Sequence, residues 1–387
     1  MTRIKILEIG KSTAGIGTYL RWLAQGLDLK RFQLTFACLS ENGMELADEL
    51  RSIEEVTAIA WPMKRFKVDP VSDLILTLRI ARLIRAGRFD LVHAHGSKAG
   101  FLARVAAIGS GVPVVYSPHC FSFHAGTNRI TANLLAALER FAARFLTAKI
   151  ITVSDGEQAL ASRFRVGNAK LFVTVHSGID PLRYESPVDK LAQKSKLGLD
   201  GNSHLIGAVG RLGEQKSPLD FVRMAALVHA QNSQTNFVWA GSGPLEGEAR
   251  KLSKELGIAD ACHFIGEYKD VPALLHVMDC LALTSLWEGF PIVLLEAMAS
   301  GVPIVATDIP GNDEAVSSGR NGWLVPAHDP SAMADKVLSL LNDSAQASAF
   351  AAAGRARIRE EFTRTQMIIS IQKVYEEVLM RKVTRKR

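Results

Sequence analysis

The sequence predicts an α/β protein made of two doubly wound, Rossmann-like domains. Apolar runs rich in β-forming residues alternate with helix-period patterns along the whole chain, and this alternation is typical of parallel sheets covered by helices. A length of 387 residues suits two domains of ordinary size. In such sheets, ligands bind at the carboxyl ends of the strands.

The apolar runs predict thirteen strands in chain order. In the first half they lie at residues 4–9, 34–39, 56–60, 91–95, 112–117, 150–153 and 171–175. In the second half they lie at residues 205–209, 236–240, 262–265, 280–284, 303–307 and 323–325. A turn rich in Gly and Pro at residues 176–181 predicts the domain boundary. A helical stripe of apolar residues between Met367 and Leu379 predicts a long last helix.

The composition is that of a globular protein, with 48% hydrophobic and 22% charged residues. The four cysteines show no CxxC spacing, so we expect buried thiols in a reducing compartment rather than disulfides or a zinc site. A strand begins almost at the N-terminus, and no uncharged apolar run approaches 18 residues. We therefore expect neither a signal peptide nor a membrane span.

The formal net charge of +7 is unevenly distributed. Residues 1–180 contain 23 Lys and Arg against 15 Asp and Glu, whereas residues 181–387 contain 23 against 24. Arg79, Arg82, Arg85 and Arg88 recur every three residues along one predicted helix, with Lys64, Arg65 and Lys67 before it. A solvated basic face and an anionic membrane surface both fit this pattern. Nucleic acid is disfavoured, because no recognition motif or aromatic interleaving accompanies the charges.

The segment from 284 to 301 carries two carboxylates, Glu288 and Glu296, with a Gly-Phe-Pro turn between them. We expect Pro291 to be the first helical residue, which places Glu288 on the preceding loop and Glu296 inside the helix. Glu296 is surrounded by apolar residues, and a carboxylate there is costly unless it is hydrogen-bonded. A pair of vicinal hydroxyls on a ligand would satisfy it.

Two further patterns indicate a phosphate ligand. Arg211 and Lys216 follow the first strand of the second half, where two cations can neutralise a diphosphate. Gly15 and Gly17 lie between the first strand and a helix expected to start near Thr18, where backbone amides favour anions. The third glycine of a G-x-G-x-x-G motif is absent, which weakens a nicotinamide interpretation, although Glu41 near the end of the second strand keeps it open.

These motifs together resemble the family 4 retaining glycosyltransferases, which have the GT-B fold. The segment 284–301 is similar to their E-x7-E motif. The resemblance extends over 301–308, 309–314, 321–326, 210–217 and 240–244, and more loosely over the N-terminal half. It implies two Rossmann-like domains facing a cleft: an acceptor-side domain at 1–180 and a nucleotide-sugar-binding domain at 181–365. A strap helix and basic tail at 366–387 would cross back to the first domain.

The resemblance also implies roles for individual residues. Arg211 and Lys216 match the family's diphosphate-binding pair, and Glu288 with the amides of Gly289 and Phe290 would orient the sugar. Glu296 would hold the ribose, and Gly266 lies in the expected base slot. His119 matches a histidine near the reacting centre, although Cys120 replaces the glycine that usually follows it.

His93 and His95 lie two apart on a strand, and hence on one face. A metal pair there lacks an evident third ligand, so we expect no metal. The family often has His-x-His here, lining the acceptor side. Lys98, in a Ser-Lys-Ala-Gly stretch, resembles enzymes that extend lipid-linked sugars in capsule or exopolysaccharide assembly.

The expected activity is therefore a retaining, metal-independent transfer from a nucleotide diphosphate sugar, with UDP favoured over GDP, to a glycan or lipid-linked saccharide. The chain contains no D-x-D triplet, which disfavours metal-dependent relatives of the other fold type. We expect no cofactor, no nucleic acid partner, and a cytoplasmic location peripheral to the inner face of the cell membrane. An NAD-dependent oxidoreductase and a non-catalytic sugar-binding module remain open as alternatives.

Overall fold

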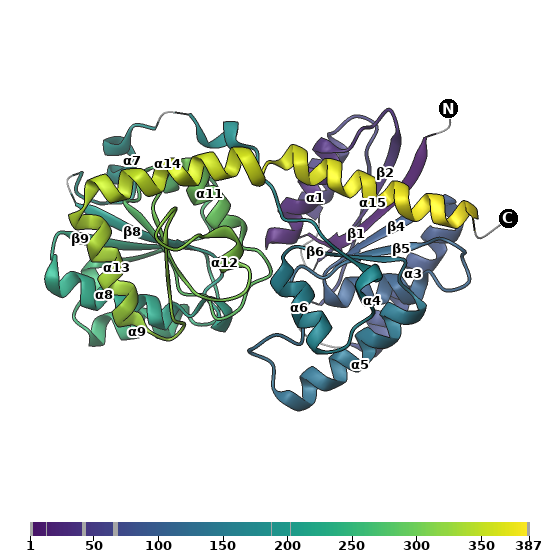
Figure 1. Cartoon of the computed structure of the whole chain (residues 1–387), viewed down its shortest axis with the longest axis horizontal. Helices are drawn as coiled ribbons and strands as arrows, with labels where there is room; N and C mark the ends of the chain where they lie inside the picture. The colour runs from purple at the N-terminus through teal and green to yellow at the C-terminus, as the bar shows by residue number, and fades with distance from the viewer. Residues whose placement is uncertain are drawn as a thin grey trace. The chain divides into compact units, whose positions relative to one another are not determined.

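The computed structural model describes residues 3–12, 14–40, 44–64, 69–186, 188–201 and 203–384. Glu41, Arg65 and Lys67 lie outside this part of the chain. The described structure consists of two compact units, each built on one sheet (Figure 1). Unit 1 comprises Met1–Ser177 and Arg364–Arg387, and unit 2 comprises Gly178–Thr363. The break between the units falls within the predicted turn at residues 176–181.

Unit 1 contains a seven-stranded parallel sheet in the order β3-β2-β1-β4-β5-β6-β7. Its strands are β1 (Ile4–Lys11), β2 (Phe32–Leu39), β3 (Thr57–Trp61), β4 (Leu91–His95), β5 (Val114–Ser117), β6 (Lys149–Thr152) and β7 (Phe172–Thr174). Its helices are α1 (Ala14–Gly26), α2 (Met44–Arg51), α3 (Pro70–Gly87), α4 (Ser97–Ala106), α5 (Arg129–Phe145), α6 (Asp155–Arg163), the 3₁₀ turn η1 (Ala169–Leu171) and α15 (Arg364–Thr384).

Unit 2 contains a six-stranded parallel sheet in the order β10-β9-β8-β11-β12-β13. Its strands are β8 (His204–Val209), β9 (Thr235–Ala240), β10 (Cys262–Gly266), β11 (Cys280–Leu283), β12 (Ile304–Thr307) and β13 (Trp323–Val325). Its helices are α7 (Lys190–Lys196), α8 (Pro218–Gln231), α9 (Glu246–Glu255), α10 (Val271–His276), α11 (Ile292–Ser300), α12 (Asn312–Ala315), α13 (Pro330–Asn342) and α14 (Ser344–Glu361). Its 3₁₀ turns are η2 (Pro181–Tyr184), η3 (Glu214–Lys216) and η4 (Ala259–Ala261).

All thirteen predicted strands are present, so the predicted fold class is confirmed. The strands read as continuous apolar runs because helices cover both faces of each sheet, leaving no solvent-facing side that would require alternation. Several helices begin at a capping residue followed by proline. Asp69 caps α3 by accepting from the Ser72 amide and Pro70 follows, and Asp329 with Pro330 does the same for α13.

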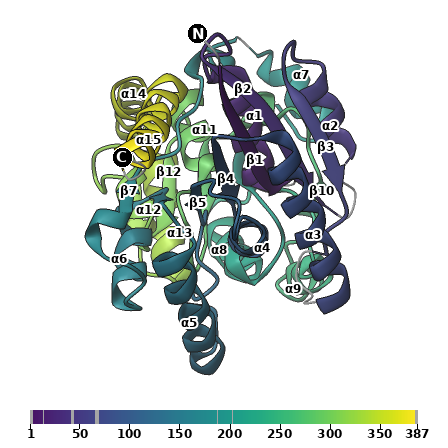
Figure 2. The ribbon, with the colours of Figure 1, turned by 90° about the vertical axis from the view of Figure 1, so that its right-hand side faces the viewer.

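The last helix, α15, belongs to unit 1, as predicted. It contacts α1, and its buried residues include Ile371, Val374 and Tyr375. Both views place α15 on the opposite side of the unit 1 sheet from α5 (Figures 1 and 2). The chain therefore leaves unit 1 after Ser177 and returns to it at Arg364.

Candidate active site

The predicted diphosphate-binding residues lie where the chain leaves β8. Gly210 adopts a φ of +150°, and its carbonyl accepts a hydrogen bond from the Trp239 indole at 2.8 Å. Arg211 is exposed, and Lys216 ends the short turn η3 just before α8. Ser217, at φ +44°, then reverses the chain into α8. Both cations therefore sit at the carboxyl end of a central strand, where the fold class predicts ligands.

Lys216 and Glu288 form a direct ion pair in unit 2. The Nζ–Oε1 distance is 2.6 Å, and both side chains are mostly shielded from solvent. The same carboxylate accepts from the Ser285 hydroxyl at 2.7 Å and the Gln215 amide at 3.2 Å. Thr284 Oγ1 in turn donates to the Lys216 carbonyl at 2.7 Å. The loops after β8 and β11 are thus joined, and two predicted site residues distant in sequence are held together.

Glu296 lies in the second turn of α11, as predicted, but Pro291 is the residue that caps the helix and Ile292 is its first residue. The shift follows from the extended ψ of 113° at Pro291. Glu296 Oε1 accepts from the Tyr184 hydroxyl at 2.8 Å, while Oε2 has no partner among the described residues. Burial raises the pKa of Glu296, partly offset by that hydrogen bond and by the charge of Arg183. One carboxylate oxygen is therefore free to accept from a ligand.

The other predicted donor-side residues are backbone elements of unit 2. Gly266 ends β10 at φ +68°, and its carbonyl accepts from the Gly241 amide at 2.7 Å. Gly289 lies against Gly311, where a Cβ would meet the Gly289 carbonyl oxygen at 2.4 Å. Phe290 is buried. These backbone positions follow β10 and β11, on the same edge of the sheet as Lys216.

Gly15 and Gly17 are not in a loop before a helix at Thr18. Helix α1 begins at Ala14, so both glycines belong to its first turn. A Cβ on Gly17 would meet the Ser12 carbonyl oxygen at 2.5 Å, and this close approach allows the abrupt passage from β1 into the helix. The glycines remain at a helix N-terminus, as predicted.

The predicted histidines of unit 1 belong to one hydrogen-bonded network centred on Glu8. His95 Nε2 lies 2.8 Å from Glu8 Oε2, and the Tyr375 hydroxyl donates to Glu8 Oε1 at 2.7 Å. His93 Nδ1 lies 2.6 Å from that hydroxyl, and its Nε2 lies 2.8 Å from Ser117 Oγ. His119 Nε2 lies 3.0 Å from His95 Nδ1 and is half-buried, whereas Glu8, His93 and His95 are fully buried.

These contacts define a single arrangement of protons. Because Tyr375 donates to Glu8, it accepts from His93 Nδ1–H, and His93 Nε2 shares a hydrogen bond with Ser117 Oγ. His95 donates to Glu8 through Nε2–H, so its Nδ1 accepts from His119 Nε2–H. In this arrangement the Glu8 carboxylate is ionised, and His95 and His119 are neutral. It leaves His119 Nδ1 as a hydrogen-bond acceptor, with no partner among the described residues.

The pKa shifts agree with this arrangement. Burial raises the pKa of Glu8, but the interactions with His93 and His95 outweigh it and lower the pKa to about 2. Burial and the neighbouring His93 lower the pKa of His95 to about 4, against the contacts with Glu8. Burial, with His95 and His93, also holds the pKa of His119 well below its usual value. At neutral pH the three-residue path from Glu8 through His95 to His119 therefore carries only the carboxylate charge.

Two predictions for this region need correction. We expected His93 and His95 to line the acceptor side, but both are fully buried and reach no solvent. We argued against a metal partly because no third ligand was evident, yet Glu8 supplies one, with its ligand atom within 4.8 Å of those of both histidines. All of these atoms already hold hydrogen bonds. The acceptor-side role of Lys98 stays a prediction; its ammonium is paired with Asp73 at 2.7 Å on neighbouring α3.

Cys120 adopts a φ of +97°, a backbone conformation that favours glycine. The preceding His119 has a φ of +52°. The Cys120 amide donates to Glu157 Oε1 at 2.6 Å, and the Val153 amide donates to the other oxygen at 2.9 Å. The two hydrogen bonds to Glu157 thus hold the turn that carries His119 in a backbone conformation that glycine adopts more easily than cysteine.

Replacing Cys120 with glycine is expected to stabilise the protein by about 1 kcal/mol, because it removes a Cβ from a left-handed position. Thermal unfolding should show a midpoint a few degrees higher, roughly 2–4 °C for a unit of this size. Cys120→Ala is the matched control: it removes the thiol but keeps the Cβ, and should give no gain. Equal midpoints for the glycine variant and the wild type would contradict a strained turn.

Sequence reasoning missed Glu8, Tyr184 and Tyr375. Glu8 lies within an apolar strand and belongs to no motif. Its isolated charge was the one available clue, since a carboxylate in a buried strand requires partners. Tyr184 and Tyr375 carry no motif, and each finds its carboxylate far along the chain.

Comparisons with known proteins agree with this architecture. The family described as "Glycosyl transferases group 1" matches residues 189–357, and the "Glycosyl transferase 4-like domain" matches residues 14–177. A UDP-Gal:alpha-D-GlcNAc-diphosphoundecaprenol alpha-1,3-galactosyltransferase of Escherichia coli is 29% identical over 319 residues, 81% of each chain. Putative glycosyltransferase EpsD of Bacillus subtilis (strain 168) is 25% identical over 327 residues, covering 83% of this chain and 82% of that one.

Solved structures show the same fold. HepE of Anabaena in complex with UDP-glucose superposes with a TM-score of 0.83 at 22% identity, covering 97% of this chain and 100% of that one. WaaG, a glycosyltransferase involved in lipopolysaccharide biosynthesis, gives 0.77 at 17% identity, with 97% and 99% covered. The fold is therefore the GT-B fold, as expected. Two family profiles over most of the chain, together with these relatives, show that the chain belongs to the family 4 glycosyltransferases.

Proposed function

We propose that this protein is a retaining, metal-independent transferase. It moves a sugar from a UDP-sugar to a glycan or lipid-linked saccharide in the assembly of a cell-surface polysaccharide. The observation that carries the proposal is the shielded Lys216–Glu288 ion pair at the strand ends of unit 2, beside Arg211. The name of the Escherichia coli relative, with its UDP-sugar donor and diphosphoundecaprenol-linked acceptor, supports the substrate class.

In this proposal unit 2 holds the donor. Arg211 and Lys216 bind the diphosphate, and Glu288 and the amides of Gly289 and Phe290 orient the sugar. Lys216 has three N–H donors, and Glu288 engages one of them, so the others can reach phosphate oxygens. Ribose hydroxyls donate to Glu296, and Gly266 lies beside the base. The HepE complexes with UDP and UDP-glucose support a uridine donor.

The reaction breaks the bond between the anomeric carbon and the diphosphate oxygen, and the electron pair stays on UDP. The acceptor oxygen then bonds to the same face of that carbon, and its proton passes to the departing diphosphate oxygen. Fixed cations stabilise the charge that develops on the leaving group, which is where electrostatic catalysis contributes most. His119, with an acceptor at Nδ1, can take a hydrogen bond from a sugar hydroxyl.

A lipid-linked acceptor would bring the enzyme to an anionic bilayer, and the basic excess of residues 1–180 supports this location. The acceptor-side role belongs to unit 1 in this proposal, and the nucleotide-sugar role to unit 2. Among the described residues, no helix combines the length and the apolar character that a membrane span needs.

A thermal-shift screen tests the proposal, since a ligand that binds the native state raises the unfolding midpoint. UDP and UDP-sugars should stabilise the protein, whereas GDP and NAD⁺ should not. UDP release from the stabilising donor should continue in the presence of a chelator. Stabilisation by NAD⁺ alone would favour the oxidoreductase, and sugar binding without UDP release with any donor would favour the binding module. Loss of activity on chelation, restored by manganese, would overturn metal independence.

Replacing Glu296 with alanine is expected to weaken UDP affinity by roughly ten- to a hundredfold, because the ribose hydroxyls lose a charged acceptor. Isothermal calorimetry with UDP measures this. Because burial raises the pKa of Glu296, wild-type affinity should also begin to fall at a pH above the ordinary glutamate value of 4.5 as the carboxylate is protonated. Tyr184→Phe is the control, since it removes a protein partner but leaves the carboxylate. Unchanged UDP affinity in Glu296→Ala would remove Glu296 from the donor site.

A further inference from the structure

Helix α5 of unit 1 is packed the opposite way from an ordinary surface helix. Its buried apolar residues are all alanines: Ala132, Ala136, Ala142 and Ala143. Five of its large apolar side chains point outward and are between 43% and 84% exposed: Ile130, Leu134, Leu138, Phe141 and Phe145. Leu135 is partly buried against the core. Amphipathic helices normally bury the large apolar face, because burial of apolar area drives folding. The outer face of α5 must therefore serve another purpose.

The five exposed side chains form one continuous stripe, which we call the α5 stripe. At about 100° of rotation per residue, they fall within a sector of about 80° along the whole helix. Phe141 and Phe145 lie with ring centroids 5.2 Å apart at its C-terminal end. Both views show α5 at the periphery of unit 1 (Figures 1 and 2). A contiguous apolar surface of this kind marks an interaction site.

The charges around the α5 stripe have one sign. Glu139 is the only acidic residue of α5; it faces inward and forms a two-bond pair with buried Arg104 at 2.6 and 2.8 Å. Arg129, Arg140 and Arg144 are exposed on the outer part of the helix. The Arg144 guanidinium lies 5.4 Å from the Phe145 ring centroid, so cation and apolar surface are adjacent.

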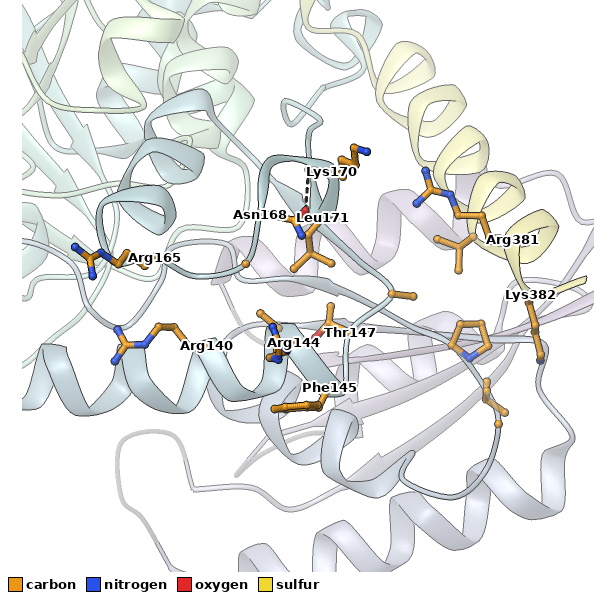
Figure 3. A pocket seen from close by; sticks show the side chains of 17 residues that line it. Arg140, Arg144, Phe145, Thr147, Arg165, Asn168, Lys170, Leu171, Arg381 and Lys382 are labelled. Carbon is orange, nitrogen blue, oxygen red and sulfur yellow. Dashed lines mark hydrogen bonds between the residues drawn. The ribbon is translucent and has the colours of Figure 1, made fainter. Parts of the chain in front are cut away.

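A pocket of about 1040 Å³ opens at the C-terminal end of α5 and extends the same surface (Figure 3). Its cations come from α5, from the segment between α6 and β7, and from α15: Arg140, Arg144, Arg165, Lys170, Arg381 and Lys382. Phe145 belongs to both the α5 stripe and this pocket. None of the described residues lining it is acidic. Arg144, Arg165 and Lys170 have no carboxylate partner among the described residues, whereas Arg381 pairs with Glu377 at 2.6 Å.

We propose that the α5 stripe and the basic pocket together dock unit 1 on an anionic phospholipid bilayer. The stripe would lie in the interfacial layer with its long axis along the membrane, and the cations of the pocket would bind lipid phosphates. A helix with an apolar face bordered by Arg is the arrangement that binds such a surface. The inference rests on the proposed function only in that a lipid-linked acceptor gives a reason for docking.

The charge distribution favours a bilayer over a second copy of the chain. A two-fold contact through the α5 stripe would bring Arg140 and Arg144 of one copy toward the same residues of the other, and like charges repel. An anionic lipid surface neutralises them. Helix α3 also exposes apolar residues, Val71, Leu74, Ile75 and Leu78, together with Arg79, Arg82 and Arg85. However, α3 has carboxylates at its start, Asp69 as its cap and Asp73 in its first turn, whereas none of the described residues lining the pocket beside α5 is acidic.

Vesicle co-sedimentation of the full chain tests the proposal. Phosphatidylglycerol–phosphatidylcholine vesicles should bind the wild type at about 100 mM salt, and phosphatidylcholine vesicles should not. The combined variant Leu138→Ser, Phe141→Ser and Phe145→Ser should lower the partition coefficient by at least about tenfold. Arg140→Glu with Arg144→Glu should do the same. Both variants should keep the wild-type unfolding midpoint and UDP affinity.

Matched variants on unit 2 serve as controls. Leu227→Ser with Leu256→Ser removes comparably exposed apolar side chains, and Lys196→Glu with Lys254→Glu makes the same change in charge on exposed helix positions. Neither should alter vesicle binding. The inference is overturned if the wild type does not bind anionic vesicles, or if the α5 variants bind them as well as the controls do.

Two further outcomes assign the surfaces differently. If reversing Arg79, Arg82 and Arg85 abolishes binding while the α5 variants retain it, the membrane-facing surface is on α3 and the inference fails. Analytical ultracentrifugation tests for a dimer. If the wild type dimerises with concentration, the α5 serine variant does not, and neither binds vesicles, then a second copy of the chain covers the α5 stripe and the inference is overturned. UDP affinity is measured separately, so vesicle binding through α5 in a chain that does not bind UDP would remove the proposed function and leave this inference standing.

Discussion

Replacing Lys216 with alanine is expected to lower the rate of UDP release by a factor of roughly 10² to 10³. The ammonium is held against Glu288 in a shielded position at the carboxyl end of β8. A fixed cation there can stabilise charge on a departing diphosphate without reorganising, and removal of one such group typically costs two to three orders of magnitude in turnover. The loss should appear mainly in kcat, because the charge develops in the transition state.

Two further variants make the Lys216 result specific. Lys216→Met keeps most of the aliphatic chain, which packs near Gly210, and should be as inactive as the alanine variant. Lys196→Ala, at an exposed position of α7, should be fully active. Turnover of Lys216→Ala within threefold of the wild type, on the order of 0.7 kcal/mol in the barrier, would remove Lys216 from the mechanism.

Replacing Glu8 with glutamine is expected to destabilise unit 1 by about 3 kcal/mol. Its carboxylate accepts from both His95 and Tyr375, and the amide nitrogen of glutamine would face one of these donors with another donor. A midpoint lower by roughly 5–10 °C in thermal unfolding would show the effect. Glu49→Gln, at an exposed position paired with Arg21, is the matched control and should change little.

The Glu8 effect should depend on pH with a definite sign. The pKa of Glu8 is lowered in the folded protein from 4.5 to about 2, so its contribution to stability is fully present above pH 4.5 and is lost as the pH falls toward 2. His95, whose folded pKa is lowered to about 4, adds a loss of stability as the pH falls from 6.5 toward 4, because the unfolded imidazole takes up a proton first. Urea unfolding across this pH range should show that the free energies of unfolding of the wild type and of Glu8→Gln become equal in acid. A constant difference would mean that Glu8 is not ionised.

Much of the fold was predictable because the signals for it are local. Apolar strand runs, the Gly/Pro turn near residue 178 and the apolar stripe of α15 each lie within a short stretch of sequence. The predictions were wrong where a contact that the apolar pattern does not show determines the local geometry. Helix α1 begins at Ala14 rather than near Thr18 because Gly17 can approach the Ser12 carbonyl, and periodicity does not report such an approach.

The site was predictable as a set of residues but not as a set of contacts. Strand-end position and motif spacing indicated Lys216 and Glu288 separately, yet their 2.6 Å pairing depends on how the β8 and β11 loops meet. His93 and His95 are fully buried, and Tyr375, the partner of His93, is far away in sequence. The packing of α5 was equally hidden: its sequence has an alanine face and a Leu/Phe face, and the usual rule would bury the larger one.

The bond from Tyr375 to Glu8 has a consequence for synthesis of the protein. Residues 178–363 of unit 2 are contiguous, so the whole sequence of this unit is made before α15. Unit 1 is completed only afterwards, because the hydroxyl that completes its buried network belongs to α15, which follows all of unit 2. During translation, the sheet of unit 1 therefore keeps an incomplete interior until α15 has been made.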